Sequence, residues 1–402
     1  MKVAFICGLH PTQDHEIVKK SKVMPQYAAD RTARNLAEGL KNILLKNITI
    51  INMPFIGGFP FGHRLIYAKS YEWAFLDEKQ ENTVAFLNIN YLSHFFRQWA
   101  VTKRTIKWVN VNVNQEQFII GYAMTSSTLA AFKAAKRKNK RVTTCLIVPD
   151  LPEYMNLSIN GLKKILLNIV VKKQKKMLKY VDTYALFSIH MADALKIGNK
   201  PFCVVEGTVN SNIKYEEINE PNFHKNIVYT GSVNLEYGIE LLLKAFSKIE
   251  GDEYKLQIAG SGNGLPLVNK FCEIDSRIQY LGVISNSEAI ELQKNASVLV
   301  NPRTAEHDFT KFSFPSKLLE YLSSGNPVLT FKLPGIPDEY DEYLQYFDNS
   351  DSLYMAKRIQ EVCNWDNERK ENNAKRSIIF LNNNVSGLEQ AKKILELRKN
   401  NI

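Results

Sequence analysis

One short segment in the second half of the chain combines residue types that can hold a phosphate group. The segment FSFPSKLLEYLSSGNPVLTF (312–331) predicts a helix that begins near Pro315 and is followed by a glycine and a strand. Ser316 offers a hydroxyl group there, and Lys317 carries a positive charge beside the helix N-terminus, where anions bind favourably. Glu320 lies one turn further and could accept hydrogen bonds from a ribose diol. The candidate nucleotide-binding residues of this segment are Phe314, Pro315, Ser316, Lys317 and Glu320. The alternative is an exposed Lys317–Glu320 pair that contributes only about a few tenths of a kcal/mol to stability.

Glycine-rich loops follow the predicted strands of the second half. In open α/β sheets ligands bind beyond the carboxyl ends of the strands, and glycines let backbone N–H groups approach an anion closely. The candidate binding residues in these loops are Gly231, Ser232, Gly260, Gly262, Gly282, Val283 and Arg303. The spacing Gly260-x-Gly262-x-Gly264 misses the dinucleotide fingerprint by one residue, and no P-loop motif occurs, which disfavours NAD enzymes and P-loop enzymes. Alternatively, the glycines form tight turns without a ligand.

Carboxylates also follow a predicted strand in the first half. Asp150 and Glu153 lie in PDLPEY, directly after the apolar segment VTTCLIV, so we expect them at the carboxyl edge of a sheet. A carboxylate in that place could orient or deprotonate an acceptor hydroxyl group. Alternatively, Asp150 before Leu-Pro simply forms a turn. His10 and His63 are further candidates in this half, although a lone histidine is more often structural.

Strands alternate with helices in both halves, which predicts parallel β-α-β units and doubly wound sheets. In the first half we expect strands at 2–9, 48–55, 83–90, 118–124 and 142–150, and helices at 30–46 and 127–138. In the second half we expect strands at 226–232, 254–262, 297–302 and 326–331, and helices at 235–249, 287–296 and 313–325. The predicted architecture is two Rossmann-like domains that face a cleft. The predicted domains are residues 1–205 and 206–385, with a linker in the polar stretch 207–226 and a C-terminal helix in 386–402 that packs back on the first domain.

Length and composition narrow the class of protein. A chain of 402 residues favours two domains, and 45% hydrophobic residues exclude wholesale disorder. Five scattered cysteines without a C-x-x-C motif disfavour a disulfide framework and a cysteine zinc site, and we expect a reducing, cytoplasmic setting. No apolar run approaches the ~20 residues that span a bilayer, and the first residues make a poor secretory signal. We therefore expect a soluble or surface-bound protein.

Charge is distributed unevenly along the chain. Residues 1–200 contain 30 Lys and Arg against 13 Asp and Glu, a net charge of +17, while residues 201–402 contain 22 against 28, a net charge of −6. This asymmetry indicates that the first half faces something anionic. Nucleic acid is disfavoured as the partner because no helix-turn-helix, zinc finger or RNA-binding pattern is present.

A basic amphipathic helix in the first half suggests what the anionic partner is. In NGLKKILLNIVVKKQKKMLK, Leu162, Ile165, Leu166, Ile169 and Val170 form one stripe at helical spacing. The candidate membrane-binding residues that flank the stripe are Lys163, Lys164, Lys172, Lys173, Lys175 and Lys176. Such a helix can lie in the headgroup layer of an anionic membrane, where each lysine adds about 1 kcal/mol. The alternative is that the stripe packs into the core and the lysines are solvated.

The segment 312–331 resembles the nucleotide-sugar site of GT-B glycosyltransferases of family 4, whose motif is E-x7-E followed by small residues, Gly and P-V-[IL]. Glu320 matches the second Glu, which in the family holds the ribose. Gly231 in YTGSVNLEYGIELLLKAF, IAGSG and YLGVIS resemble further family elements, and the similarity extends over nearly the whole chain. The resemblance implies that the second domain binds a nucleotide-sugar donor. It also implies sugar transfer from a nucleotide diphosphate with retention of configuration, without a cofactor or an essential metal, and no D-x-D triplet is present.

Three positions depart from the family pattern. Phe312 stands where the first Glu of the motif is expected, and Glu306 or Asp308 could replace that carboxylate from a shifted loop. Ser232 and Tyr237 stand where the family often has Arg and Lys, which neutralise the leaving diphosphate. Lys317, Lys311 or Arg303 could supply that charge instead.

The sequence therefore favours a retaining glycosyltransferase with Asp150, Glu153 and Lys317 as candidate catalytic residues. We expect it to be peripheral on the inner face of a bacterial cell membrane and to extend a lipid-linked saccharide in surface polysaccharide (capsule or exopolysaccharide) biosynthesis. Two alternatives stay open: a nucleotide-sugar 2-epimerase of the same fold, and a non-catalytic glycosyltransferase-like subunit of a partner enzyme.

Overall fold

The computed structural model describes residues 1–11, 15–23, 27–75, 78–81, 83–90, 92–153, 161–214, 225–306 and 308–399. The chain divides into two compact units. Unit 1 comprises Met1–Ser211 and Val385–Ile402, and unit 2 comprises Asn212–Asn384. The first change of unit thus falls six residues after the predicted boundary at 205. It does so because Val209 still pairs with Ser386 in unit 1.

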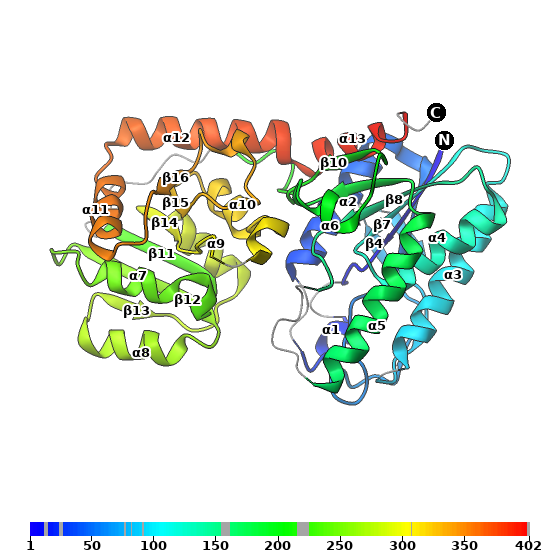
Figure 1. Cartoon of the computed structure of the whole chain (residues 1–402), viewed down its shortest axis with the longest axis horizontal. Coiled ribbons are helices and arrows are strands. Elements are labelled where there is room, and N and C mark those ends of the chain that lie inside the picture. Colours follow the sequence, from blue (N-terminus) through cyan, green and yellow to red (C-terminus); the bar gives the residue numbers. More distant parts are fainter. Residues whose placement is uncertain are drawn as a thin grey trace. The chain divides into compact units, whose positions relative to one another are not determined.

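Unit 1 is built on a six-stranded parallel sheet with the strand order β10-β9-β8-β7-β1-β2. Its strands are β1 (Lys2–Cys7), β2 (Ile48–Asn52), β7 (Gln117–Tyr122), β8 (Thr143–Val148), β9 (Thr183–Leu186) and β10 (Phe202–Val204). The four central strands are almost completely buried, because helices cover both faces of the sheet (Figure 1). This burial explains why these strands consist of nearly continuous apolar runs.

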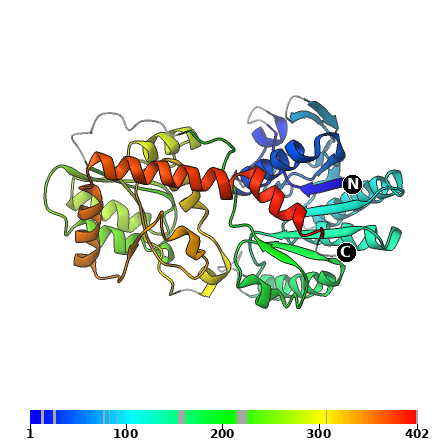
Figure 2. The same cartoon turned by 90° about the horizontal axis from the view of Figure 1, so that it is seen from above.

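Three helices of unit 1 pack side by side, with α4 (Ser126–Lys138) between α3 (Ser93–Val111) and α5 (Leu162–Met177) (Figure 1). The long helix α2 (Tyr27–Leu44) connects β1 to β2, and right-handed crossovers place it on the opposite face from α4 and α5. The C-terminal helix α13 (Gly387–Glu396) packs against α2, and Figure 2 shows this red helix beside the blue one. The C-terminal segment therefore belongs to unit 1.

The remaining elements of unit 1 are short. They are α1 (Glu16–Lys19), the antiparallel pair β3 (Tyr67–Ala68) and β6 (Phe86–Leu87), the antiparallel pair β4 (Glu72–Phe75) and β5 (Glu78–Glu81), α6 (Met191–Leu195), and 3-10 turns at Leu45–Asn47 and Leu178–Tyr180. The prediction of a sheet strand at 83–90 was wrong. Within this stretch Phe86–Leu87 forms a strand that pairs with the two-residue β3 and not with the main sheet, and Ile89 makes one bridge to Phe59. Thr83 makes a single bridge to the edge strand β2 at Asn52.

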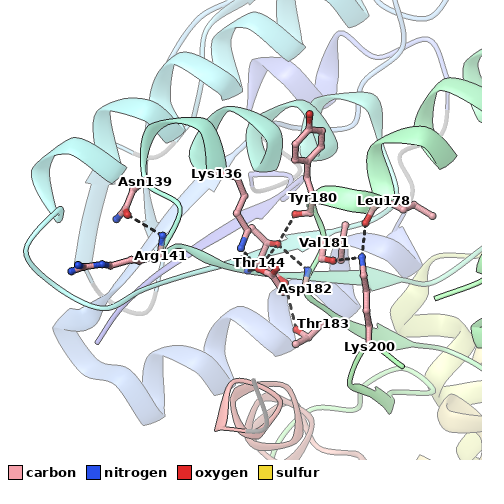
Figure 3. Close-up of polar contacts among 10 residues, drawn as sticks. All are labelled: Lys136, Asn139, Arg141, Thr144, Leu178, Tyr180, Val181, Asp182, Thr183 and Lys200. Atoms are coloured by element: carbon pink, nitrogen blue, oxygen red, sulfur yellow. Dashed lines mark hydrogen bonds and ion pairs between the residues drawn. The ribbon is translucent and has the colours of Figure 1, made fainter. Parts of the chain in front are cut away.

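A polar cluster ties the ends of α4 and α5 to the amino ends of β8 and β9 (Figure 3). Asp182 accepts hydrogen bonds from the Thr144 N–H at 2.8 Å and from the Thr144 hydroxyl at 3.1 Å, and pairs with Lys136 at 2.5 Å. Lys200 donates to the Leu178 and Val181 carbonyls at 2.9 and 2.6 Å, and burial lowers the pKa of its amine. Lys136 and Lys200, two of the basic residues in the first half of the chain, are therefore structural.

Unit 2 has a second parallel sheet with the order β13-β12-β11-β14-β15-β16. Its strands are β11 (Lys225–Ser232), β12 (Tyr254–Ser261), β13 (Ile278–Tyr280), β14 (Val298–Asn301), β15 (Val328–Phe331) and β16 (Gln345–Phe347). Its helices are α7 (Ile239–Phe246), α8 (Leu265–Ile274), α9 (Asn286–Lys294), α10 (Ser316–Ser323), α11 (Ser352–Cys363) and α12 (Asn367–Phe380). Short turns lie at Leu235–Tyr237, Asp308–Phe312 and Asp338–Tyr340, and a π-turn lies at Leu381–Val385. The two parallel α/β sheets confirm the predicted fold class.

The predicted helix 235–249 is interrupted. Gly238 has a φ of +80°, and a Cβ atom there would lie 2.0 Å from the Pro302 carbonyl oxygen. The left-handed backbone ends the short turn Leu235–Tyr237, and α7 begins at Ile239. A glycine therefore lets the loop after β11 touch the loop after β14.

The close contact between α2 and α13 in unit 1 can be tested by mutation. A Cβ atom on Gly39 would lie 2.1 Å from the Gly387 carbonyl oxygen, which is backbone that cannot move aside cheaply. We expect Gly39→Ala to lower the free energy of unfolding of unit 1 by about 2 kcal/mol, because close packing at the crossing is lost. Thermal unfolding measures the effect. Asn42→Ala, at an exposed position of the same helix, should leave stability unchanged or slightly raised, and equal stability of both variants would contradict the packing.

Candidate functional site

The candidate nucleotide site of unit 2 lies at the carboxyl ends of its central strands. The strand order reverses between β11 and β14, and in open α/β sheets this switch point is where ligands bind. β11 ends in Gly231 and Ser232, and β14 ends at Asn301, directly before Pro302 and Arg303. The structure therefore brings together loops that are about 70 residues apart in the sequence.

Two glycines allow the loops after β11 and β12 to approach closely. Gly231 and Gly260 are register partners, with φ values of +145° and +141°. A Cβ atom on Gly260 would lie 1.7 Å from the Gly231 carbonyl oxygen, and one on Gly262 would lie 2.2 Å from the Val233 carbonyl oxygen. These contacts exclude side chains at Gly260 and Gly262, so backbone groups are left bare at these two positions.

Lys317 lies across Gly231. A Cβ atom on Gly231 would be 3.6 Å from Cε and 3.8 Å from Cγ of the Lys317 side chain. The Lys317 amine forms an ion pair of 2.5 Å with Glu320, whose side chain is only 15% exposed. The two residues therefore do pair, as the simple alternative requires. Their pair is partly buried against a glycine loop, however, and does not lie on the open surface of α10.

Tyr321 fixes α10 against β11. Its hydroxyl group accepts a hydrogen bond from the Thr230 N–H at 2.9 Å and donates one to the Thr230 carbonyl at 3.1 Å. Burial raises the pKa of Tyr321 to about 12, so the hydroxyl keeps the proton that it donates. This anchor sets the distance between Lys317 and Gly231. Sequence reasoning missed Tyr321, and its only signal was an aromatic residue directly after Glu320.

The predicted binding residues at the start of α10 differ in how exposed they are. Ser316 is exposed at the first helical position, while Pro315 precedes it with an extended backbone and makes no side-chain cap. Phe314 is buried, and its ring lies 5.0 Å from the ring of Tyr340. The structure therefore places Phe314 in the core of unit 2, where it supports the helix start from behind.

Arg303 lies over two aromatic rings of the loops around the switch point. Its guanidinium carbon is 4.4 Å from the centre of the Phe309 ring and 5.1 Å from that of Tyr237, and Nη2 donates to the Ser313 hydroxyl at 3.3 Å. Tyr237 is the position where the resembling family often has a cation. The structure thus places the cation of Arg303, from the loop after β14, over Tyr237, the position where the family often has a cation of its own.

The other predicted replacements are more exposed. Lys311 pairs with Asp308 at 3.4 Å, and both side chains are at least half exposed. Glu306 is also exposed, and Phe312 is half-buried in the turn before α10. Among these residues the structure brings none as close to the glycine loops as Lys317.

The loop after β13 is tied to the loop after β12. The Gly260 N–H donates to the Gly282 carbonyl at 2.8 Å, and the Tyr280 hydroxyl donates to the Gly260 carbonyl at 2.8 Å. Gly282 has a φ of +75°, and Val283 after it is well exposed. Ser232 is exposed too, and its carbonyl accepts a hydrogen bond of 2.6 Å from Tyr229.

The candidate carboxylates of unit 1 differ in their surroundings. Asp150 is exposed two residues after β8, while Glu153 forms an ion pair with Lys175 of α5. The structure thus joins two residues for which the sequence predicted separate roles. Glu153 thus neutralises Lys175 locally, while Asp150 is exposed at the carboxyl edge of the sheet.

The two candidate histidines of unit 1, His10 and His63, are both buried but differ in bonding. The His63 ring contacts the Ile17 carbonyl at 2.8 Å and accepts from the Leu65 N–H at 2.9 Å, so it is structural. Around His10, Asp30 accepts from its backbone N–H at 2.6 Å, and Arg34 donates to its carbonyl at 2.7 Å. Neither ring nitrogen of His10 has a hydrogen-bond partner among the described residues, and burial lowers its pKa.

Helix α5 presents its apolar stripe to solvent. Ile165, Ile169 and Val170 are exposed, whereas Val171, Gln174 and Leu178 form the buried face. The alternative that the stripe packs into the core is therefore wrong for these three residues. Lys172, Lys173, Lys175 and Lys176 are exposed beside them. The side chains of Leu162, Lys163, Lys164 and Leu166 lie outside the part of the molecule that is described.

The described residues contain neither a metal-binding cluster nor a membrane-spanning helix. No three His, Cys, Asp or Glu side chains within these ranges gather as a metal site. None of the described helices is long and apolar enough to cross a bilayer.

One family model matches a segment of unit 2. Residues 224–364 match the family model described as Glycosyl transferases group 1. No curated protein matches the chain.

Solved structures resemble the chain over its whole length. The lipopolysaccharide outer core galactosyltransferase WaaB, in its apo form, has 16% identity and a TM-score of 0.62, with 100% of both chains covered. Sucrose-phosphate synthase from Thermosynechococcus elongatus has 13% identity and a TM-score of 0.65, with 100% of this chain and 99% of that chain covered. HepE from Anabaena, in complex with UDP, has 12% identity and a TM-score of 0.62, with 100% of both chains covered. At these identities the likeness concerns the fold. The group 1 domain and the shared fold together support a glycosyltransferase with the GT-B fold.

Proposed function

We propose that the protein transfers a sugar from a nucleotide diphosphate sugar to a saccharide acceptor, with retention of configuration at the transferred sugar. The observation that carries this proposal is the position of Lys317 across Gly231, with Glu320 paired to it. A lysine beside a glycine of this loop can meet a diphosphate that binds above the glycines. Glu320 then loses its ion-pair partner to the phosphate and can accept hydrogen bonds from the ribose, as the family resemblance implies.

The leaving diphosphate gains negative charge as its bond to the sugar breaks, so cations near it stabilise the transition state. Lys317 and Arg303 are the two cations that the geometry favours for this role. Arg303 is held over Tyr237 and Phe309, so its guanidinium is already oriented before a donor binds. These groups, together with the backbone N–H groups at the start of α10, support a reaction without an essential metal.

The proposed acceptor is a lipid-linked saccharide of bacterial surface polysaccharide biosynthesis. Its support is the net charge of +17 in residues 1–200 and the exposed apolar stripe of α5 with lysines beside it. A basic amphipathic helix of this kind binds anionic membrane surfaces, and a pyrophosphate-linked lipid is itself anionic. Asp150 is the proposed group that orients or deprotonates the acceptor hydroxyl. We propose that the protein acts as a peripheral protein on the inner face of the membrane.

The first test separates sugar transfer from the alternatives. Incubation with UDP-sugars, with and without a saccharide acceptor, should give UDP and a new glycoside only when acceptor is present, and chelation of divalent metals should leave the rate unchanged. UDP is the probe because HepE was solved with it. Conversion of the donor to an epimer without acceptor would instead favour an epimerase. Binding of UDP without any turnover would favour a non-catalytic subunit.

The second test addresses Lys317. Lys317→Ala should lower kcat by about 100-fold to 1,000-fold, because charge stabilisation of the leaving group is lost. It should also weaken UDP binding about tenfold, as loss of a charge-assisted hydrogen bond does. The matched control is Lys244→Ala, which removes a similar ion pair with Glu240 from the exposed face of α7. Wild-type turnover in a folded Lys317→Ala protein would contradict the assignment.

The third test addresses Arg303. Arg303→Ala should weaken UDP binding about tenfold, measured by calorimetry, and Arg303→Lys should restore only part of it because lysine lacks the planar stacking group. Arg369→Ala is the control, since Arg369 lies 4.0 Å from the ring centre of Trp365 in the same unit. If both alanine variants bind UDP equally well, Arg303 does not carry the proposed charge.

A further inference from the structure

Three adjacent helices of unit 1 contain no acidic residue. The helices α3, α4 and α5 together carry 14 Lys and Arg and no Asp or Glu, and α4 packs against both of the others. By contrast, α2 and α13, which pack on each other, mix both signs of charge, with Asp30 and Glu38 in one and Glu389 and Glu396 in the other. The positive charge of the first half is therefore concentrated on one helical face, which we call the basic face.

Helix α3 exposes large apolar side chains on this face. Leu92, at the cap of the helix, Phe95 and Trp99 follow at i, i+3 and i+7, so they form one stripe. Phe95 is 56% exposed and Trp99 is 64% exposed. The stripe then becomes basic, because Lys103 lies 5.0 Å over the Trp99 ring and exposed Lys107 follows one turn later.

The apolar surface continues beyond α3 onto the pair β3–β6. β6 packs against α3, and the Arg97 guanidinium of α3 lies 4.7 Å over the ring of Phe86 in β6. Tyr67 and Leu87 face each other across this pair, and both are exposed. Contiguous exposed apolar groups of this kind mark an interaction surface.

Helix α5 repeats the same order of residues. Ile165 and Ile169 are 57% and 60% exposed in its first half, and exposed Lys172, Lys173 and Lys176 follow in its second half. Both α3 and α5 lead into strands of the same parallel sheet, so the two helices run in the same direction (Figure 1). The exposed apolar residues of both helices therefore lie towards the carboxyl edge of the sheet, and Lys103, Lys107, Lys172, Lys173 and Lys176 follow behind them.

We propose that the basic face of unit 1 rests on an anionic bilayer and that Phe95 and Trp99 of α3 insert into its headgroup layer. The proposal rests on the membrane role of α5 proposed above and adds a second, aromatic anchor on α3. Aromatic residues concentrate at the membrane interface, and lysines behind them meet anionic headgroups. The three helices of this face carry positive charges and no carboxylate, so the face complements a negatively charged lipid surface. The exposed apolar residues of α3 and α5 lie in the first halves of these helices, towards the carboxyl edge of the sheet, where Asp150 follows β8.

The test uses the full chain and vesicles of phosphatidylcholine, with or without phosphatidylglycerol. Wild-type protein should sediment with the anionic vesicles, and less so as salt rises. The double variant Phe95→Ser/Trp99→Ser should reduce binding about tenfold, as should the triple variant Lys172→Gln/Lys173→Gln/Lys176→Gln. The matched controls are Ile274→Ser and the triple variant Lys248→Gln/Lys270→Gln/Lys357→Gln, all at exposed positions of unit 2. These controls should bind as wild type does.

Tryptophan fluorescence gives a readout that does not depend on affinity. The chain has four tryptophans, so the assay uses a Trp73→Phe background. Brominated lipids in the vesicles should quench the emission of this protein, and adding Trp99→Phe should remove most of the quenching, because Trp108 and Trp365 are buried. UDP binding in the absence of vesicles should be unchanged in every one of these variants.

The outcomes separate this proposal from the proposed function. If the Phe95/Trp99 variant binds vesicles as wild type does while the lysine variant does not, the α3 anchor is overturned and the α5 contact stands. If no protein binds either vesicle but UDP still binds, the membrane role fails and the donor site stands. If the Phe95/Trp99 variant changes only the oligomeric state in solution, the stripe is a protein interface and the lipid proposal is overturned.

Discussion

The contact between Gly231 and Gly260 is the constraint on which the candidate site depends. The Gly231 carbonyl oxygen lies only 1.7 Å from the place where any side chain on Gly260 would begin. Both residues have positive φ values, which residues other than glycine rarely adopt. The two loops can therefore approach each other at Gly260 only as bare backbone, and Lys317 lies 3.6 Å from the place where a Cβ atom on Gly231 would be. Tyr321 holds α10 against β11 through two hydrogen bonds to the backbone of Thr230.

The electrostatics of the site follow from this packing. A glycine loop offers N–H groups but no charge, so the positive charge that a diphosphate needs must come from elsewhere. Lys317 comes from α10, and Arg303 comes from the loop after β14, where aromatic rings hold its planar guanidinium. In the proposed donor site, Lys317 and Arg303 take the place of the cations that are missing at Ser232 and Tyr237. The positive charge of unit 1 is distributed differently. The lysines and arginines of α3, α4 and α5 are spread over one helical face and do not gather around one binding point.

Much of the fold could be predicted from the sequence because its signals are local. Buried parallel strands require continuous apolar runs, and KVAFIC, FIIGY and TTCLIV all became central strands of unit 1. The predicted strand at 83–90 failed because its apolar residues serve a small antiparallel pair and not the sheet. The predicted helix at 235–249 was cut by Gly238, since the Pro302 carbonyl of a distant loop occupies the space of its side chain. In both cases a long-range partner overrode a sound local pattern.

The sequence by itself determined the kinds of elements, the uneven charge and the presence of Lys317 and Glu320 one turn apart, because these depend on residue type and short spacing alone. It also determined that α5 has an apolar stripe, since helical periodicity is a local property. Only the tertiary structure decided that this stripe faces solvent while Val171 and Gln174 face the core. It alone paired Glu153 with Lys175, placed Arg303 over Tyr237 and joined Tyr321 to Thr230, 91 residues away. The physical reason is that such contacts depend on how distant elements pack, and one chain's local pattern does not contain that packing.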